Sequence, residues 1–349
     1  SLFQVRNRNR YRAVVITGSG TAANEAILSS VVGEGAILIL SNGEFGKRLH
    51  KTSVIHNKKT HLLEQPWGKP FDLTSIAAYL ASHKIEVVAM VHHETCLGML
   101  NPLAEIGALA KTHGAIFVVD GVSSVGAEVV DLEACNIAFC SSSSSKAIGS
   151  YPGLSFVIGR EKQFKKLKVY AAKTTYLNLA TFYAFLKGHC QTPNTPAVPL
   201  FFALDQALTN ILLEGVTKRF ARIRARAKRL RLGMRKLNLE FEIAEADMCS
   251  ILTTVKVPPS VSVRDLRDRL REKSIIIYEG KGSYAGKVFQ VGNIGELSDQ
   301  DIRYFLKSLR EVLLTLQGEG ADLAAPLKTK VSNLVLLPNL STSFEGAGL

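Results

Sequence analysis

The chain has 349 residues, of which 46% are hydrophobic and 21% charged, so it is long enough to bury a large core and to form two domains. It lacks any uninterrupted apolar run of about eighteen residues, and its N-terminal stretch 1–12 is basic and polar, which argues against a membrane span or a signal peptide and favours a soluble, cytoplasmic protein. The formal net charge of +13 makes nucleic acid the first partner to consider, and ten of the 43 Lys and Arg residues lie within positions 218–236.

Short apolar runs alternate with helical patterns through the first half of the chain, and this rhythm is typical of β-α-β units. Strands that are covered by helices on both faces read as continuous apolar runs. Such runs occur at 13–16, 36–40, 87–91, 116–119, 137–140 and 154–158. We therefore predict an α/β fold over residues 10–175, with a mostly parallel central sheet and helices on both faces.

A glycine-rich turn follows the first predicted strand and leads into a helix predicted over 22–32. Ser19, Gly20 and Thr21 in this turn suit a bound phosphate, because backbone N–H groups, two hydroxyls and the positive end of the helix would face the anion. Seen alone, the same pattern is also typical of an ordinary helix cap.

Two charged residues follow predicted central strands. Asp120 comes directly after the run 116–119, at the edge where ligands bind in open α/β sheets, although an acid there can also cap a helix. Lys146 ends a run of five serines, 141–145, in a loop between strands. A lysine that binds an aldehyde, an acid that keeps a pyridine nitrogen protonated and a phosphate-binding turn are the groups that pyridoxal 5'-phosphate requires. Because all three groups occur together in this chain, in the order turn, acid and lysine, we predict this cofactor.

The second half of the chain has a different pattern. After a proline-rich stretch at 192–199, a helical region extends to about residue 236, and apolar runs at 251–255, 275–277 and 288–291 precede a helix at 299–316. This pattern predicts a smaller C-terminal α+β domain. The predicted divisions are a large cofactor-binding domain at 1–190, a proline-rich crossing with a long basic helix at 191–236, the small domain at 237–316 and a tail without pattern at 317–349.

Apolar residues in the basic segment 218–236 recur at spacings of three and four, which indicates one amphipathic helix with a solvated basic face. They are Phe220, Ile223, Ala227, Leu230 and Met234. No aromatic interleaving or known binding motif accompanies the charges, so we expect no nucleic-acid partner. The five cysteines include no C-x-x-C pair, which favours reduced thiols and gives no support for a bound metal.

Six segments resemble the fold-type I, class V aminotransferases, which depend on pyridoxal 5'-phosphate. They lie at 17–26, 42–46, 92–102, 119–124, 142–146 and 195–199, and the resemblance extends over about residues 10–316. The most specific is the string HHETCLGMLNP at 92–102, which within that family is most similar to the 2-aminoethylphosphonate–pyruvate transaminases. The resemblance implies transfer of an amino group from an amine to a 2-oxo acid, here from 2-aminoethylphosphonate to pyruvate.

The resemblance also implies roles for individual residues. Asp120 faces the pyridine nitrogen, and Lys146, next to Ser145, binds the cofactor covalently and transfers the proton. The other contacts implied for the cofactor are the phosphate ligands Ser19, Gly20 and Thr21, Phe45 and Val122 on the two faces of the ring, Thr95 near the phenolic oxygen, Ser145, and Thr195 reaching the phosphate of a neighbouring subunit. The role of Thr195 implies a homodimer.

Two departures from the family pattern leave other functions open. Ser1 is not an initiator methionine and the family has a longer N-terminal segment, so we expect a fragment, a processed form or an unusual gene model. Gln290 stands where the family commonly has an arginine for the substrate carboxylate, and a neutral glutamine lacks that charged fork. The alternatives are an alanine–glyoxylate or serine–pyruvate type of aminotransferase, or a degenerate relative without catalytic activity.

Overall fold

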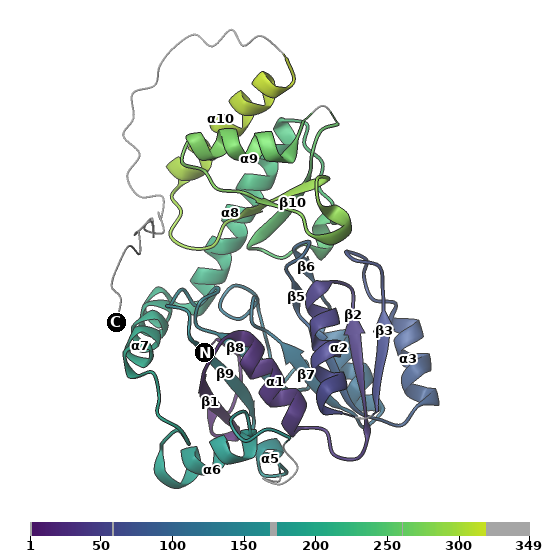
Figure 1. Cartoon of the computed structure of the whole chain (residues 1–349). Coiled ribbons are helices and arrows are strands. Elements are labelled where there is room, and N and C mark those ends of the chain that lie inside the picture. Colours follow the sequence, from purple (N-terminus) through teal and green to yellow (C-terminus); the bar gives the residue numbers. More distant parts are fainter. Residues whose placement is uncertain (1, 58, 168–172, 260, 319–349) are drawn as a thin grey trace, which may run out of the picture.

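The structure is a computed structural model that describes residues 2–57, 59–167, 173–259 and 261–318 (Figure 1). Its larger sheet has seven strands in the order β1-β9-β8-β7-β4-β2-β3. Their bounds are β1 Tyr11–Thr17, β2 Ala36–Ser41, β3 Thr60–Glu64, β4 Ile85–Val91, β7 Ile116–Asp120, β8 Ile137–Ser143 and β9 Leu154–Arg160. The helices of this region are α1 Gly20–Ser30, α2 Glu44–His56, α3 Leu73–Ser82, α4 Leu103–Thr112, α5 Glu161–Phe164, α6 Leu179–His189 and α7 Val198–Glu214.

The central strands run in one direction, which confirms the predicted mostly parallel sheet. β2 pairs in parallel with β3 and β4, β4 with β7, and β7 with β8. The exception is β9, which is antiparallel to both β8 and β1. A parallel return needs a crossover of a dozen or more residues, and only the loop 144–153 separates β8 from β9.

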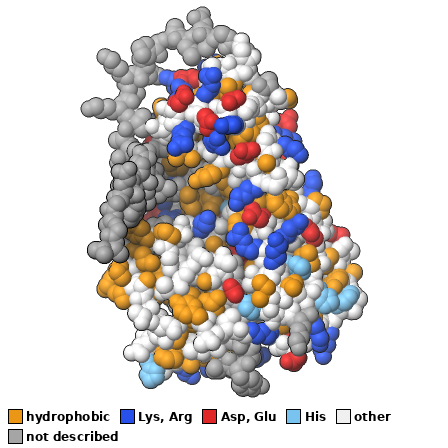
Figure 2. Space-filling view, in the orientation of Figure 1, with side chains coloured by type: hydrophobic (Ala, Val, Ile, Leu, Met, Phe, Trp, Pro, Cys, Tyr) orange, Lys and Arg blue, Asp and Glu red, His pale blue; other side chains and the backbone are white. Residues whose placement is uncertain are grey.

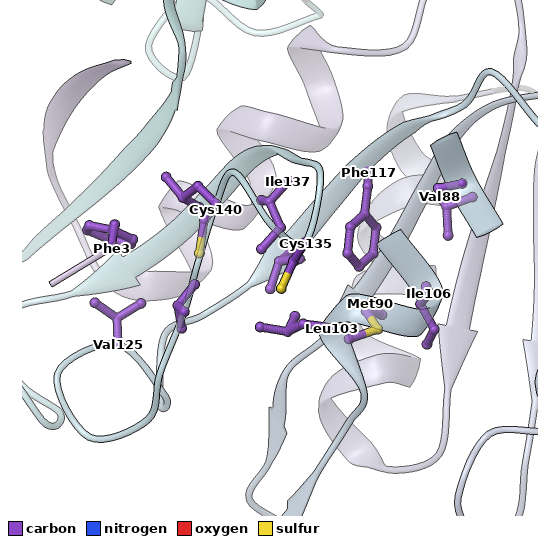
Figure 3. Packing of buried hydrophobic residues seen from close by; sticks show 14 of the residues in the cluster. Phe3, Val88, Met90, Leu103, Ile106, Phe117, Val125, Cys135, Ile137 and Cys140 are labelled. Atoms are coloured by element: carbon purple, nitrogen blue, oxygen red, sulfur yellow. The ribbon is translucent and has the colours of Figure 1, made fainter. Parts of the chain in front are cut away.

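Two hydrophobic layers cover the faces of the sheet. The first layer contains apolar residues of α3, α4 and α7, and the second contains those of α1, α2 and α6. Because side chains alternate along a strand, Leu38 of β2 belongs to the first layer whereas Ile37 and Ile39 belong to the second. Figure 3 shows part of the first layer, with Leu103 of α4 beside Met90 of β4. A doubly covered sheet of this kind leaves its strand ends as the open edge for a site.

The small domain has its own sheet and its own core. Its strands β10 (Leu252–Lys256), β11 (Tyr278–Glu279) and β12 (Val288–Gly292) are antiparallel, and α9 (Val263–Glu272) and α10 (Asp299–Leu316) pack on them. Figure 1 shows α8 (Val216–Lys236) running between this domain and the large sheet. The proposed domain limits at residues 190 and 236 stay a prediction, and the predicted tail lies outside the described residues from 319 onward.

The basic segment forms α8 as predicted, and its apolar stripe is buried. The helical region before it is divided by Gly215, whose φ of 85° ends α7. Two arginines of α8 are buried as well: Arg226 donates to the carbonyl of Gly295 at 2.8 Å, and Arg231 donates to the hydroxyl of Thr253 at 3.1 Å. The basic face is therefore only partly solvated, since part of it binds the small domain.

Some local predictions were wrong. The run 275–277 is not a strand, because the chain leaves α9 through a left-handed Ser274 with φ 59°, and Ile275 and Ile277 pack into the core without pairing. The sequence pattern did not indicate β3, whose first four side chains are only half-buried, nor the short hairpin of β5 (His93–Glu94) and β6 (Met99–Leu100). This hairpin lies beside the open edge of the sheet.

Three further features bear on the class of protein. All five cysteines are free thiols, and four of them are buried. Within the described residues, no helix combines the length and the apolar character that crossing a membrane requires. The same part of the chain contains no group of three or more His, Cys, Asp or Glu side chains arranged to hold a metal ion.

Candidate functional site

A cavity of 360 Å³ opens at the C-terminal edge of the large sheet. The last residues of three neighbouring strands line it, namely Val91 of β4, Asp120 of β7 and Ser143 of β8. Its volume falls in the range of about 300–1,000 Å³ that small-molecule sites occupy. The predicted site residues that line it are Ser19, Gly20, Thr21, Phe45, Asp120, Val122, Ser145 and Lys146.

Three other predicted site residues lie elsewhere among the described residues. Thr95 is half-buried in the turn between β5 and β6, and Thr195 is exposed in the segment before α7; neither lines the cavity. Gln290 of β12 uses its Nε2 to donate to the carbonyl oxygens of Thr95 and Cys96, at 3.1 and 2.8 Å. It also reaches the hydroxyl of Thr254 at 3.3 Å, so its amide joins the small sheet to the β5–β6 turn.

Asp120 is the most deeply placed acid of the cavity. It is 7% exposed, and burial raises the pKa of its carboxyl group. Two donors oppose that shift: the N–H of Val122 lies 2.9 Å from Oδ1, and the amide of Asn24 lies 2.6 Å from Oδ2. Asn24 is in turn fixed by the hydroxyl of Ser141 at 2.5 Å. The carboxylate is therefore held in one orientation, ready for a cation that enters the cavity.

The N-terminus of α1 forms the next wall. Ser19 is the N-cap residue, and its side chain makes no capping hydrogen bond with the helix. Helix N-termini attract anions through their N–H groups and their dipole. Gly20 allows a close approach here, because a Cβ at this position would lie 2.6 Å from a methyl group of Val122. The turn that was predicted to bind phosphate and the apolar Val122 side chain thus adjoin one another.

Glu94 connects the motif at 92–102 to the helix that carries Phe45. Its Oε2 accepts hydrogen bonds from the N–H groups of Phe45 and Gly46, both at 3.0 Å, and so caps α2. Burial raises the pKa of Glu94, although these N–H donors lower it. Gly43 makes room for the carboxylate, since a Cβ there would lie 2.2 Å from Glu94. Phe45 is in this way presented to the cavity by a buried acid.

The loop that carries Lys146 is held from two sides. Ser144 donates its hydroxyl to the carbonyl of Tyr151 at 2.6 Å, which closes the turn after β8. Arg219 of α8 donates to the carbonyls of Ala147 at 2.6 Å and Gly126 at 2.8 Å. Lys146 itself has an exposed side chain that lines the cavity. The backbone around this lysine is thus fixed, whereas its side chain is accessible to a ligand.

His93 lines the same cavity and is 2% exposed. Its Nδ1 lies 3.3 Å from the carbonyl oxygen of Ser123; because a carbonyl only accepts, Nδ1 carries the proton. Burial lowers the pKa of His93 to about 4, so the ring is neutral at physiological pH. Its Nε2 is buried and has no hydrogen-bond partner within the described residues. An unpaired acceptor of this kind indicates a site that a polar ligand completes.

Two more cations line the cavity where the small domain meets α2. They are Arg48 of α2 and Lys281, in the loop between β11 and β12. The guanidinium carbon of Arg48 lies 4.7 Å from the centre of the Phe45 ring. Figure 2 shows Lys and Arg side chains gathered on the face of the molecule where the two domains meet. This end of the cavity is positively charged, in contrast to the end that contains Asp120.

The residues around the cavity fit pyridoxal 5'-phosphate. A fixed buried carboxylate suits a protonated pyridine nitrogen, the uncapped N-terminus of α1 suits a phosphate, and the Phe45 and Val122 side chains suit an aromatic ring. The unpaired Nε2 of His93 and the unpaired hydroxyl of Ser143 add polar contacts. The individual contacts remain predictions.

The lining residues that the sequence reasoning missed include Asn24, Arg48, His93 and Lys281. Helical spacing would have indicated the first two, because Asn24 follows Thr21 by three positions and Arg48 follows Phe45 by three, on the same faces of their helices. His93 lies inside the motif that carried the resemblance. Lys281 comes from the other domain, and no local pattern points from it to the cavity.

This chain is similar to known aminotransferases both in sequence and in structure. The family model for aminotransferase class V matches residues 4–294. A 2-aminoethylphosphonate–pyruvate transaminase of Klebsiella pneumoniae is 34% identical over 304 residues, which are 86% of this chain and 83% of that protein. An uncharacterized aminotransferase of Methanocaldococcus jannaschii is 30% identical over 324 residues, 90% of this chain and 84% of that protein. The crystal structure of an alanine–glyoxylate aminotransferase from Nostoc sp. matches with a TM-score of 0.82 and 28% identity, covering 89% of this chain and 83% of that chain.

Proposed function

We propose that this chain, which belongs to the class V aminotransferase family and depends on pyridoxal 5'-phosphate, transfers the amino group of 2-aminoethylphosphonate to pyruvate. The products would be phosphonoacetaldehyde and alanine. The observation that carries the proposal is that Lys146, Asp120 and the N-terminus of α1 open into one cavity, in a chain one third identical to a relative of that name. That relative also supports an active enzyme over a degenerate form.

Bound pyridoxal 5'-phosphate supplies an aldehyde for the donor amine and a ring that takes up the electrons of the carbon that loses a proton. The Asp120 carboxylate binds the ring nitrogen and favours its protonated form, and Asn24 and Val122 keep the carboxylate oriented for that contact. Lys146 Nζ removes the proton from the amine-bearing carbon of the donor and returns it later in the cycle. Phe45 and Leu49 of α2 help to keep water from this side of the cavity.

An alternative to this proposal uses a different class of amino donor. The runner-up function is amino transfer of the alanine–glyoxylate or serine–pyruvate type, and the structural match to an alanine–glyoxylate aminotransferase supports it. Gln290 does not separate the two, because its amide is occupied by backbone carbonyls and pyruvate and alanine carry a carboxylate just as glyoxylate and serine do. The ratio of kcat/KM for 2-aminoethylphosphonate, alanine and serine distinguishes the two proposals.

The proposed active unit is a homodimer. Helix α7 exposes an apolar surface in which Phe202 is 74% and Leu213 is 81% exposed, and the segment before α7 carries Thr195. Exposed apolar patches of this kind are typical of protein interfaces. Sedimentation of the wild type should give twice the chain mass, and Phe202→Lys with Leu213→Lys should give the chain mass. A wild-type protein that sediments as a monomer at all concentrations would rule this out.

The first experiment follows the absorption of the cofactor in purified protein. Addition of 2-aminoethylphosphonate should replace the band of the lysine-bound cofactor by that of its amine form, and pyruvate should restore it. Lys146→Ala is expected to show neither change, and Lys287→Ala, a change of an exposed lysine outside the cavity, should behave as the wild type. If the band responds to alanine but not to the phosphonate, the runner-up is correct.

A further inference from the structure

Arg48 and Lys281 have no part in the chemistry described above, although both line the active-site cavity. They reach it from different domains. Arg48 belongs to α2 of the large domain, whereas Lys281 belongs to the loop that joins β11 and β12 of the small domain. With Lys146, they are the three positively charged side chains among the described residues of the cavity wall. Two of the three cations, Arg48 and Lys281, therefore have no role in the proposed reaction so far.

The loop that carries Lys281 is held in place on the large domain. The hydroxyl of Tyr284 donates to the carbonyl of Trp67 at 3.2 Å. Gly282, with φ 56°, packs close enough to Trp67 that a Cβ would lie 3.2 Å from the indole ring. These contacts place Lys281 over α2, and a lysine with a fixed backbone loses less freedom when it binds a ligand.

Glu44 lies between the two cations. Its Oε1 is 3.3 Å from a guanidinium nitrogen of Arg48, and its Oε2 is 3.5 Å from Nζ of Lys281. Hydrogen bonds between charged groups are typically about 2.7–2.9 Å long, so both contacts are loose. Oε2 is buried and lacks a hydrogen bond within the described residues. One carboxylate thus serves two cations that retain most of their donors.

Position 290, where the family commonly has an arginine for the substrate carboxylate, cannot pair an anion in this chain. Gln290 is neutral, and its Nε2 already lies within bonding distance of three acceptors. A substrate with a phosphonate or carboxylate brings a charge that must be paired in a partly desolvated cavity. Arg48 and Lys281 offer guanidinium and ammonium donors for that charge.

We infer that Arg48 and Lys281 form the subsite for the anionic group of the substrate, so that the enzyme selects primary amines with an anion at the far end. This inference rests on the proposed function and names its specificity residues. A phosphonate with two charges binds there more tightly than a carboxylate with one. Glu44 competes with the substrate, since its carboxylate offsets part of the positive charge of both cations until the anion arrives.

Calorimetry with methylphosphonate tests the subsite without turnover, because this anion has no amine and cannot react. Lys281→Ala in the cofactor-loaded enzyme should weaken binding about tenfold, whereas Lys287→Ala, which removes an exposed lysine of the same loop outside the cavity, should leave it unchanged. Arg48→Lys, which keeps the charge and loses the fork, should weaken it less than Arg48→Ala. Acetate should bind more weakly than methylphosphonate to the wild type.

Glu44→Gln separates an anion subsite from a structural contact between the domains. If Glu44 competes with the substrate, this variant binds methylphosphonate more tightly than the wild type. If the contacts of Glu44 serve only to hold the domains together, it binds more weakly, as Lys281→Ala does, and the inference is overturned. Absence of binding to the wild type, or equal binding to Lys281→Ala, also overturns it.

The donor assay keeps this inference distinct from the proposed function. If the enzyme binds methylphosphonate through Lys281 but does not use 2-aminoethylphosphonate, the donor is wrong and the anion subsite stands. If it uses 2-aminoethylphosphonate and Lys281→Ala leaves both KM and methylphosphonate binding unchanged, the donor is right and the subsite is wrong.

Discussion

The two ends of the cavity are built by different means. At the deep end, which we define as Asp120, Asn24 and Val122, the charged group is buried and each oxygen of the carboxylate has a donor within 2.9 Å. At the rim, defined as Glu44, Arg48 and Lys281, the ion pairs are 3.3 and 3.5 Å long and the Lys281 side chain is 63% exposed. The deep end suits a resident cofactor that stays bound, and the rim suits a substrate that enters and leaves.

Lys146 lines the same cavity, and its loss should have the largest effect on the reaction. Lys146→Ala should lower kcat by about a thousandfold or more, because a positioned acid–base group contributes about 10²–10⁴-fold. The side chain is exposed, so the temperature of unfolding without cofactor should not change. Steady-state kinetics and a thermal melt measure both effects. A fall of only a few-fold in kcat would assign the proton transfer to another group.

Asp120→Asn tests the deep end by removing its charge while keeping its shape. We expect a fall of about a hundredfold in kcat and weaker retention of the cofactor, since the ring nitrogen loses the anion that favours its protonated form. Kinetics and equilibrium dialysis of the cofactor provide the measurements. Asp131→Asn, a change of an acid that does not line the cavity, is the control. Unchanged kinetics in Asp120→Asn would mean that the carboxylate only orders its loop.

The buried histidine of the cavity predicts how stability depends on pH. The pKa of His93 is lowered by burial from its ordinary value of 6.5 to about 4 in the folded chain, so the unfolded chain binds the proton first as pH falls. Stability is present above pH 6.5 and is lost as the pH falls toward 4, by about 3 kcal/mol at most. His93→Gln should flatten this part of the curve in urea unfolding of the cofactor-free protein. The pH dependence that remains in this variant comes from His92, whose pKa is lowered to about 3. An unaltered slope would show that His93 has the same pKa in the folded and the unfolded chain.

Salt should affect the rim more than the deep end, and this is the smallest effect that we predict. Exposed charges are screened beyond about 8 Å at physiological ionic strength, whereas buried pairs are screened much less. The KM for the phosphonate donor should therefore rise several-fold between low and high salt, while the dissociation constant of the cofactor changes less. Equal salt dependence of the two constants would remove the distinction between the ends.

The sequence predicted best the strands that are buried on both faces. The strands β4, β7 and β8 appear as continuous apolar runs because helices cover both of their faces, and parallel strands bring their C-terminal ends to one edge. That is why Asp120 and Lys146 lie in one cavity, as their order along the chain suggested. By contrast, β3 reads THLLE and is mostly half-buried, so no continuous apolar pattern marks it.

Contacts between distant segments were beyond the sequence pattern. The place of Lys281 depends on how the small domain packs on Trp67, and the occupation of Gln290 depends on carbonyls of the β5–β6 turn. Neither contact has a periodic signal, because each joins segments far apart in the chain. For the same reason, the pattern of α8 predicted its apolar stripe but not the burial of Arg226 and Arg231.

Helix α8 gives the active site a mechanical connection to the small domain. Arg219 near its beginning holds the carbonyls of Gly126 and Ala147, while Arg231 near its end holds Thr253 of the small sheet. Because α8 contacts the Lys146 loop near one end and the small sheet near the other, a tilt of the small domain would also shift the backbone beside Lys146. Part of the excess positive charge that first suggested a polyanion partner is therefore used in contacts within the chain. Replacing these arginines by lysine would preserve the net charge and weaken the hydrogen bonds that hold the two ends of α8.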